Sequence, residues 1–145
     1  MTQFDKRNLS MMMDFYEMTM SYGYFEQGGG DRRVAFDLFF RSVPDKGGYA
    51  VFAGLKHVIE FVENLSFSDE DIDYFRAQNL FSEEFLSFLR GFRFRGDIYA
   101  VPEGTIIYPD EPLMTIVAPI IDAQLIETAL LAQINHQSLI ATKAS

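Results

Sequence analysis

The sequence predicts an α+β domain in which helices pack on short, largely antiparallel strands. Three features lead to this class. Apolar residues recur at helical spacing in several segments, and short apolar runs near residues 97–117 are separated by turn sequences that contain proline. The chain has 145 residues, of which 48% are hydrophobic and 15% aromatic, so a single domain with its own core is expected.

The first part of the chain is predicted to form one helix and one strand. The helix is expected over residues 11–25, with Ser10 as its N-cap and the glycine run at 28–30 as its end. One face of this helix is expected to be apolar and to carry Met12, Phe15, Met18, Thr19 and Tyr22. The strand follows at residues 34–40, and its apolar groups on both sides predict a strand covered on both faces.

A loop at residues 44–48 is predicted to lead into three helices. In the first helix a 3.6-residue period is kept by Leu55, Val58, Ile59, Val62 and Leu65. The second and third helices are expected to begin at Ser68 and Ser82, because each serine is followed by acidic residues, which suit a helix N-terminus.

The remainder of the chain is predicted to hold short strands and a final helix. Strands are expected at residues 97–101, 104–108 and 113–117, because the turns between them contain Pro, which fixes φ, and Gly, which accepts positive φ. The three strands are expected to form a small antiparallel unit. A long helix begins near Ile120, and since no Gly or Pro ends it, a truncated chain is expected.

The composition excludes several classes of function. The absence of Cys excludes disulfides, thiolate catalysis and Cys-ligated zinc, and a net charge of −9 argues against nucleic acid as a partner. No signal peptide is seen, and no apolar run approaches the roughly 18 residues that span a bilayer, so a soluble cytoplasmic protein is expected. The acidic residues at 69–73 resemble a metal cluster, but a solvated helix N-terminus explains them and no metal site is predicted.

Four stretches of the chain carry a resemblance to a known family. They are residues 8–25, which contain Asp14-Phe15-Tyr16, residues 34–41 with 47–55, residues 96–104, and residues 127–131 with 134–145. In this order they resemble the nicotinate phosphoribosyltransferase family over essentially the whole chain. Several collinear stretches are more specific than a single short motif.

The resemblance implies both an architecture and a reaction. The family resembles type II phosphoribosyltransferases, in which an N-terminal α/β domain packs on an incomplete α/β barrel. Residues 1–120 would form that domain, and residues 121–145 would be the helix that leads into a catalytic barrel absent from this chain. The family couples nicotinate to phosphoribosyl pyrophosphate, giving nicotinate mononucleotide for NAD salvage. It uses ATP through a phosphohistidine, with Mg²⁺ expected on the phosphates, and its active site lies at a homodimer interface.

Tyr16 is the residue to which the resemblance gives the most definite role. In the family and in its nicotinamide-using relatives, the Tyr of an Asp-x-Tyr motif stacks on the pyridine ring, reaching in from the partner subunit, and Asp14 would be a polar neighbour. Offset stacking of two aromatic rings adds about 0.5–1.5 kcal/mol to their burial. Without the resemblance, the apolar surroundings of Tyr16 favour core packing.

Four further residues are weaker candidates for substrate binding. Arg41 follows a strand and would face a phosphate or carboxylate, or else be an exposed or ion-paired arginine. His136 would line the pyridine or phosphate pocket, or else pack in the core or between helices. Thr142 and Lys143 lead toward the barrel, and Lys143 is a candidate phosphate contact.

The catalytic residues themselves are expected beyond Ser145. By the resemblance, the phosphorylated His and the Arg that pairs with the nicotinate carboxylate both lie there, so the isolated chain is predicted to be inactive. The alternative is a non-catalytic role, in which a truncated or stand-alone α+β domain associates with itself, or binds a small molecule or a protein, through exposed apolar faces.

Overall fold

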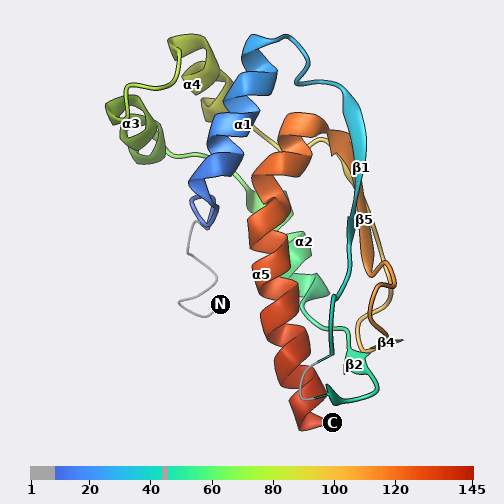
Figure 1. Cartoon of the computed structure of the whole chain (residues 1–145). Helices are drawn as coiled ribbons and strands as arrows, with labels where there is room; N and C mark the ends of the chain where they lie inside the picture. Colours follow the sequence, from blue (N-terminus) through green and yellow to red (C-terminus); the bar gives the residue numbers. More distant parts are fainter. Residues whose placement is uncertain (1–8, 44–45) are drawn as a thin grey trace.

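The computed structural model describes residues 9–43 and 46–145, and Figure 1 shows how their elements are arranged. Residues 1–8, where a signal peptide was argued to be absent, and residues 44–45 of the predicted loop lie outside the described residues. In chain order the elements are α1 (Phe15–Glu26), β1 (Arg33–Leu38), β2 (Ala50–Val51), α2 (Leu55–Asn64), α3 (Asp69–Ala77), α4 (Glu83–Arg90), β3 (Asp97–Ala100), β4 (Ile106–Ile107), β5 (Met114–Pro119) and α5 (Ile120–Ala144).

The long helix α5 is the central element of the fold. Figure 1 shows it running along the molecule, with α1 beside its first half and strands β1 and β5 on its other side. Every residue over 120–126 is buried, as expected of a helix that is enclosed all round. In the second half burial is restricted to one side, where α5 contacts β2 and α2. No helix in the described part of the chain is long and apolar enough to cross a membrane.

The strands form two separate antiparallel sheets, which confirms the predicted α+β class with short antiparallel strands. In the larger sheet β5 is central, and it pairs with β1 and with β3. In the smaller sheet β2 pairs with β4, so that Ala50 lies opposite Ile107. The predicted three-stranded unit of neighbouring strands is therefore wrong in its pairing. Its middle strand joins β2, and its place in the larger sheet is taken by β1, from far earlier in the chain.

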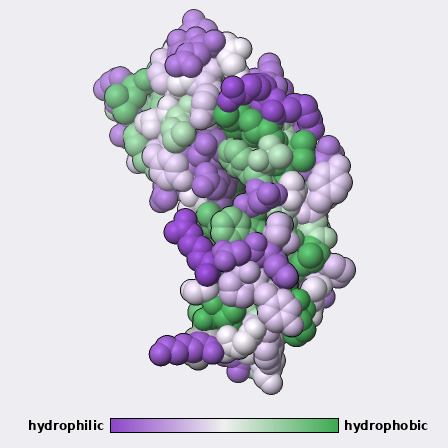
Figure 2. All heavy atoms as spheres, turned by 45° about the vertical axis from the view of Figure 1, so that its right-hand side comes forward, coloured by the Kyte–Doolittle hydropathy of each residue, from purple (hydrophilic) through white to green (hydrophobic). Residues whose placement is uncertain are grey.

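Strand β1 is covered on one face only. Its burial alternates along the strand, with Val34, Phe36 and Leu38 turned toward the core and Ala35 and Asp37 exposed. The expectation that both faces are covered is wrong for the described residues, because nothing among them packs on the second face. Figure 2 brings this side of the molecule forward and shows hydrophobic patches exposed between polar ones.

Helices α3 and α4 begin at the predicted serines. The Ser68 hydroxyl accepts a hydrogen bond from the Asp71 N–H at 3.2 Å, and the Asp71 carboxylate accepts one from the Ser68 N–H at 2.8 Å. This reciprocal capping box satisfies two backbone donors at the start of α3. The Ser82 hydroxyl accepts from the Phe85 N–H at 3.2 Å at the start of α4.

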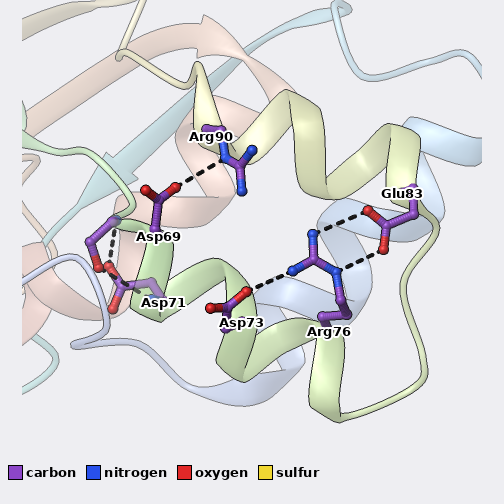
Figure 3. Close-up of polar contacts among 7 residues, drawn as sticks. Asp69, Asp71, Asp73, Arg76, Glu83 and Arg90 are labelled. Carbon is purple, nitrogen blue, oxygen red and sulfur yellow. Dashed lines mark hydrogen bonds and ion pairs between the residues drawn. The ribbon is translucent and has the colours of Figure 1, made fainter.

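The remaining acidic side chains around α3 take part in surface ion pairs. Figure 3 shows Asp69 pointing toward Arg90, and Asp73 toward Arg76, which also contacts Glu83 at the start of α4. The Arg76–Glu83 pair, at 2.9 Å, links α3 to α4. These side chains are exposed, and exposed ion pairs contribute about 0–1 kcal/mol each, so they orient the two helices more than they stabilise them.

Helix α1 begins later than predicted. Its N-cap is Asp14, and Ser10 serves a different purpose. The buried Ser10 hydroxyl accepts a hydrogen bond from the Ser66 N–H at 3.1 Å and donates one to the Ser66 carbonyl at 2.5 Å. Ser10 thereby joins the chain before α1 to the segment after α2, which the local sequence does not reveal.

The buried faces of α1 and α2 also differ from the prediction. In α1 the fully buried residues are Glu17, Met18 and Ser21, whereas Phe15 is 43% exposed. In α2 the predicted core residue Ile59 is 42% exposed. Tyr22 and Phe25 of α1 lie against Phe85 of α4, with ring centroids 5.2 and 5.3 Å from that of Phe85, and these contacts hold α1 against α4.

Candidate functional site

The Asp-x-Tyr motif lies at the N-terminal end of α1. Tyr16 is in the first turn of the helix and its side chain is 45% exposed, so it is a surface residue and not part of the core. Asp14 precedes the helix in an extended conformation, is exposed, and makes no side-chain cap hydrogen bond. An aromatic ring and a carboxylate are thus presented to solvent within two residues of each other.

Acidic groups surround the Tyr16 hydroxyl. Partial burial raises the pKa of Tyr16, and the nearby carboxyl groups of Glu127, Glu17 and Asp14 raise it further, while the Thr128 side chain lowers it. Tyr16 is therefore a neutral phenol at pH 7. The electrostatic potential around its hydroxyl is negative, which favours a neutral or cationic ligand over an anion at that point.

Beneath Tyr16, the side chain of Glu17 joins α1 to α5. Glu17 is 0% exposed, and one of its carboxyl oxygens accepts hydrogen bonds from the Thr128 N–H at 2.8 Å and from the Thr128 hydroxyl. Its other oxygen, Oε2, has no hydrogen-bond partner among the described residues. Burial raises the pKa of Glu17, the hydrogen bonds from Thr128 lower it, and Glu127 and Asp14 raise it.

A groove of about 340 Å³ lies between β1 and α5. Its walls are mainly apolar and include Phe36, Leu130 and Leu131, and the ionisable residues Asp37 and Glu127 also border it. Glu127 also acts on the Tyr16 hydroxyl, so this residue is common to the groove and to the surroundings of Tyr16. The carboxylate of Glu127 accepts a hydrogen bond from the Gln124 side chain at 3.0 Å.

The weaker candidates lie in other elements. Arg41 is exposed beyond the end of β1. His136 is exposed on α5, so the expectation of core or helix-interface packing is wrong for it. Lys143 is exposed in the last turn of α5. The Thr142 hydroxyl already accepts from the Val51 N–H at 2.9 Å and donates to the Ser138 carbonyl at 2.6 Å, so it is occupied in holding β2 against α5.

Three residues of this site, Glu17, Thr128 and Glu127, were not predicted from the sequence as site residues. Ionisable residues are rarely fully buried, so a helical pattern places Glu17 on the outside of α1 by default. The partner of Glu17 is 111 residues away in the sequence, and no local signal connects the two. The sequence gives one sign of this buried polar contact. Glu17 and Ser21 interrupt the apolar pattern on the inner face of the helix.

Comparison with known proteins places this geometry in a family. Residues 11–135 match the profile described as the nicotinate phosphoribosyltransferase (NAPRTase) N-terminal domain. A nicotinate phosphoribosyltransferase of Mycobacterium tuberculosis is 45% identical over 136 residues, which cover 94% of this chain and 29% of that protein. The Bacillus subtilis nicotinate phosphoribosyltransferase is 44% identical over 142 residues, which cover 98% of this chain and 29% of that protein.

A solved structure agrees with the sequence comparisons. The crystal structure of human nicotinic acid phosphoribosyltransferase superposes with a TM-score of 0.84 at 32% identity, over 91% of this chain and 27% of that one. The chain thus spans less than a third of the length of these relatives. The predicted resemblance is confirmed, and the chain belongs to the nicotinate phosphoribosyltransferase family, whose N-terminal domain it carries.

Proposed function

We propose that this chain acts as the N-terminal domain of an enzyme that transfers the phosphoribosyl group of phosphoribosyl pyrophosphate to nicotinate in NAD salvage. Tyr16 supplies one aromatic wall of the pocket for the pyridine ring. This role is supported by the half-exposed ring of Tyr16. The ring belongs to helix α1, which the buried Glu17–Thr128 hydrogen bond attaches to α5. An exposed aromatic ring on a well-held backbone is suited to stacking, because little side-chain freedom is lost when a ligand binds.

The acidic surroundings of Tyr16 suit the reaction. The pyridine nitrogen forms a bond to the ribose carbon as the carbon–oxygen bond to pyrophosphate breaks, and the electron pair of that bond leaves with pyrophosphate. The ring thereby becomes a pyridinium cation. The face of the Tyr16 ring and the carboxyl groups of Glu127 and Asp14 favour a positive ring over a neutral one. The same field requires the nicotinate carboxylate to point away from the Tyr16 hydroxyl.

The described residues do not fit a Mg²⁺ site. No group of three or more His, Cys, Asp or Glu side chains among them is arranged to hold a metal ion. We propose that the whole enzyme uses ATP with Mg²⁺, held by residues outside this chain. Cytoplasmic location and a homodimer in which Tyr16 faces the partner subunit are part of the same proposal.

Exposed apolar side chains on α5 support self-association as a second candidate function. Leu139 is 36% exposed and Ile140 is 54% exposed on the second half of the helix. Both apolar side chains lie on the side of α5 that no other described element covers. Sedimentation of the isolated chain tests this candidate. A dimer that Ile140→Ser dissociates supports it, and a monomer at all concentrations contradicts it.

A domain exchange tests the proposed enzyme function. This chain would replace the matching N-terminal segment of the Bacillus subtilis enzyme, to which it is 44% identical. We expect the folded chimera to form nicotinate mononucleotide from nicotinate and phosphoribosyl pyrophosphate, and the isolated 145-residue chain to form none. A chimera with the native sedimentation and circular dichroism of the Bacillus enzyme, but without activity, would contradict the proposal.

Two substitutions in the chimera test the role of Tyr16. Tyr16→Leu removes the aromatic face, and since stacking adds about 0.5–1.5 kcal/mol, we expect the KM for nicotinate to rise about three- to tenfold. Tyr16→Phe keeps the ring and serves as the matched control, with a KM within about twofold of the unsubstituted chimera. Equal KM values for Tyr16→Leu and Tyr16→Phe would exclude stacking on Tyr16.

A further inference from the structure

Two polar atoms are buried without partners on the inner face of α1. They are Glu17 Oε2 and Ser21 Oγ, which belong to residues one helical turn apart. Residues at this spacing lie on the same side of a helix. The Ser21 hydroxyl has no hydrogen-bond partner among the described residues, whereas Glu17 is bonded to Thr128 through its other oxygen. Among the described residues, the hydrogen bonds from α5 to a side chain of α1 go to Glu17.

The hydrogen-bond partner of Glu17 also influences the Tyr16 hydroxyl. The Thr128 hydroxyl donates to the Glu17 carboxyl, and the Thr128 side chain lowers the pKa of Tyr16. Tyr16 and Glu17 are neighbours in the chain, and successive helical residues point about 100° apart. Thr128 thus holds the buried Glu17, and the exposed ring of Tyr16 is carried by the next residue of the same helical turn.

We propose that Glu17 is a positioning residue, whose buried carboxyl group, held on Thr128, fixes the first turn of α1 on α5 and thereby sets the orientation of the Tyr16 ring for a pyridine ligand. The part of this inference that concerns the ligand rests on the proposed function. The part that concerns the Tyr16 ring does not, because it depends only on contacts within the chain.

The charges around Glu17 favour its protonated form. The titratable groups that act on it are Asp14 and Tyr16 of its own segment and Glu127 of α5, and none of these is a cation. Burial and these acids oppose ionisation, and Thr128 only partly offsets them. A neutral amide of the same shape is therefore the natural substitute. In Glu17→Gln the side-chain carbonyl oxygen accepts the same two hydrogen bonds from Thr128.

The first experiment measures the Tyr16 ring in the 145-residue chain. Ring resonances of ¹³C-labelled tyrosine are assigned by their loss in Tyr16→Phe, and their shifts and line widths are compared among variants. We expect Glu17→Ala to shift and broaden the Tyr16 signals and Glu17→Gln to restore them. Ser21→Ala, which removes the other buried polar group of this face, is the matched control and should leave them unchanged. A folded Glu17→Ala chain with unchanged Tyr16 signals overturns the proposal.

Thr128→Val checks the same contact from the α5 side. It removes the hydroxyl that bonds to Glu17 and keeps the shape of the side chain. If Glu17→Ala fails to fold, this milder variant still reports on Tyr16. We expect Thr128→Val to shift the Tyr16 signals in the same direction as Glu17→Ala. If the folded Thr128→Val chain shows sharp, unshifted Tyr16 signals, the proposal is also contradicted.

The second experiment uses the active chimera. If the Tyr16 ring is misplaced, it stacks less well on the pyridine ring of nicotinate. We therefore expect Glu17→Ala to lower kcat/KM for nicotinate about tenfold. The KM for phosphoribosyl pyrophosphate should stay unchanged, and Glu17→Gln should recover most of the loss. An equal loss for both substrates would indicate general damage to the fold and contradict a positioning role. If the unsubstituted chimera is inactive, that result contradicts only the proposed function. The role of Glu17 is then decided by the NMR experiment.

Discussion

Arg95 holds the fully buried carboxylate of Asp122 with three hydrogen bonds. The Arg95 backbone N–H donates to Asp122 at 2.9 Å, Nε donates at 3.3 Å and Nη2 at 2.8 Å. Asp122 is in the first turn of α5, and Arg95 lies in the segment between α4 and β3. This pair therefore ties the start of the central helix to the chain that enters the larger sheet. Arg95 also reaches the exposed Asp31 at 3.1 Å.

Replacing Arg95 by Met is expected to destabilise the fold strongly. It leaves the Asp122 carboxylate buried with one backbone donor, and breaking a buried ion pair from one side costs about 3 kcal/mol or more. Urea unfolding at pH 7, followed by circular dichroism, measures the loss. Arg33→Met is the control, because the Arg33–Asp97 pair spans 3.5 Å between two exposed side chains and is worth at most about 1 kcal/mol. Similar losses in both variants would contradict this ranking.

The stability of the chain should depend on the ionisation of Glu17. Because the pKa of Glu17 is raised in the folded state, the unfolded chain loses this proton at a lower pH than the folded chain does. Stability from this group is therefore complete at pH values below the ordinary carboxyl range and falls as the pH rises through the raised pKa.

Glu17→Gln removes this dependence. Urea midpoints measured between pH 4 and pH 8 are expected to fall less steeply with pH for Glu17→Gln than for the unsubstituted chain, and to be higher at pH 8. Glu70→Gln, in the exposed first turn of α3, is the control for removing one acidic group at the surface. Parallel midpoint curves for the unsubstituted chain and Glu17→Gln would show that Glu17 ionises normally.

Gly96 is expected to tolerate no side chain. A Cβ at this position would stand 2.5 Å from the Ala118 Cβ and 2.8 Å from the Val117 carbonyl oxygen, both on the adjacent strand β5. Gly96→Ala should therefore push β3 from β5 and cost roughly 1–3 kcal/mol in thermal or urea unfolding. Gly91→Ala is the matched control, since a Cβ there meets nothing within 4 Å. It should be neutral or slightly stabilising, and a loss as large as that of Gly96→Ala would contradict the steric explanation.

The capping box of α3 gives a smaller, local effect. Ser68→Ala removes the acceptor for the Asp71 N–H, and losing such an N-cap costs about 1 kcal/mol. Ser87→Ala, at an exposed position inside α4, is expected to be close to neutral. Urea midpoints of the two variants test the difference. A Ser68→Ala chain as stable as Ser87→Ala would mean that the cap is satisfied equally well by water.

Local sequence signals predicted the helices and four of the strands, but neither strand β2 nor the way the strands pair. The serines at the starts of α3 and α4 were identified because a cap and its acidic neighbours lie within one turn of each other. The partner of β4 was missed because three helices and strand β3 separate β2 from it, and no local signal near residues 104–108 indicates β2. The open outer face of β1 was missed because apolar residues such as Ala35 occur on exposed faces as well.

Of the candidate site, only the residues of the Asp-x-Tyr motif were predictable from the sequence. Asp14 and Tyr16 were found from the sequence, and their exposure agrees with a role at a surface pocket. The bond between Thr128 and the buried Glu17, next to Tyr16, depends on the packing of α1 against α5, which no sequence periodicity encodes. Buried polar contacts between distant residues follow from the assembled fold, and a single sequence read locally does not contain them.

The attachment of β2 to α5 determines when that strand acquires its structure. The Val51 N–H donates to the Thr142 hydroxyl, 91 residues later, and the Ala53 N–H donates to the Ser138 hydroxyl, 85 residues later. During synthesis on the ribosome, β2 therefore makes these two contacts only after residues up to 142 have emerged. Until then these amide hydrogens exchange freely with water, and they become protected only when the end of α5 docks.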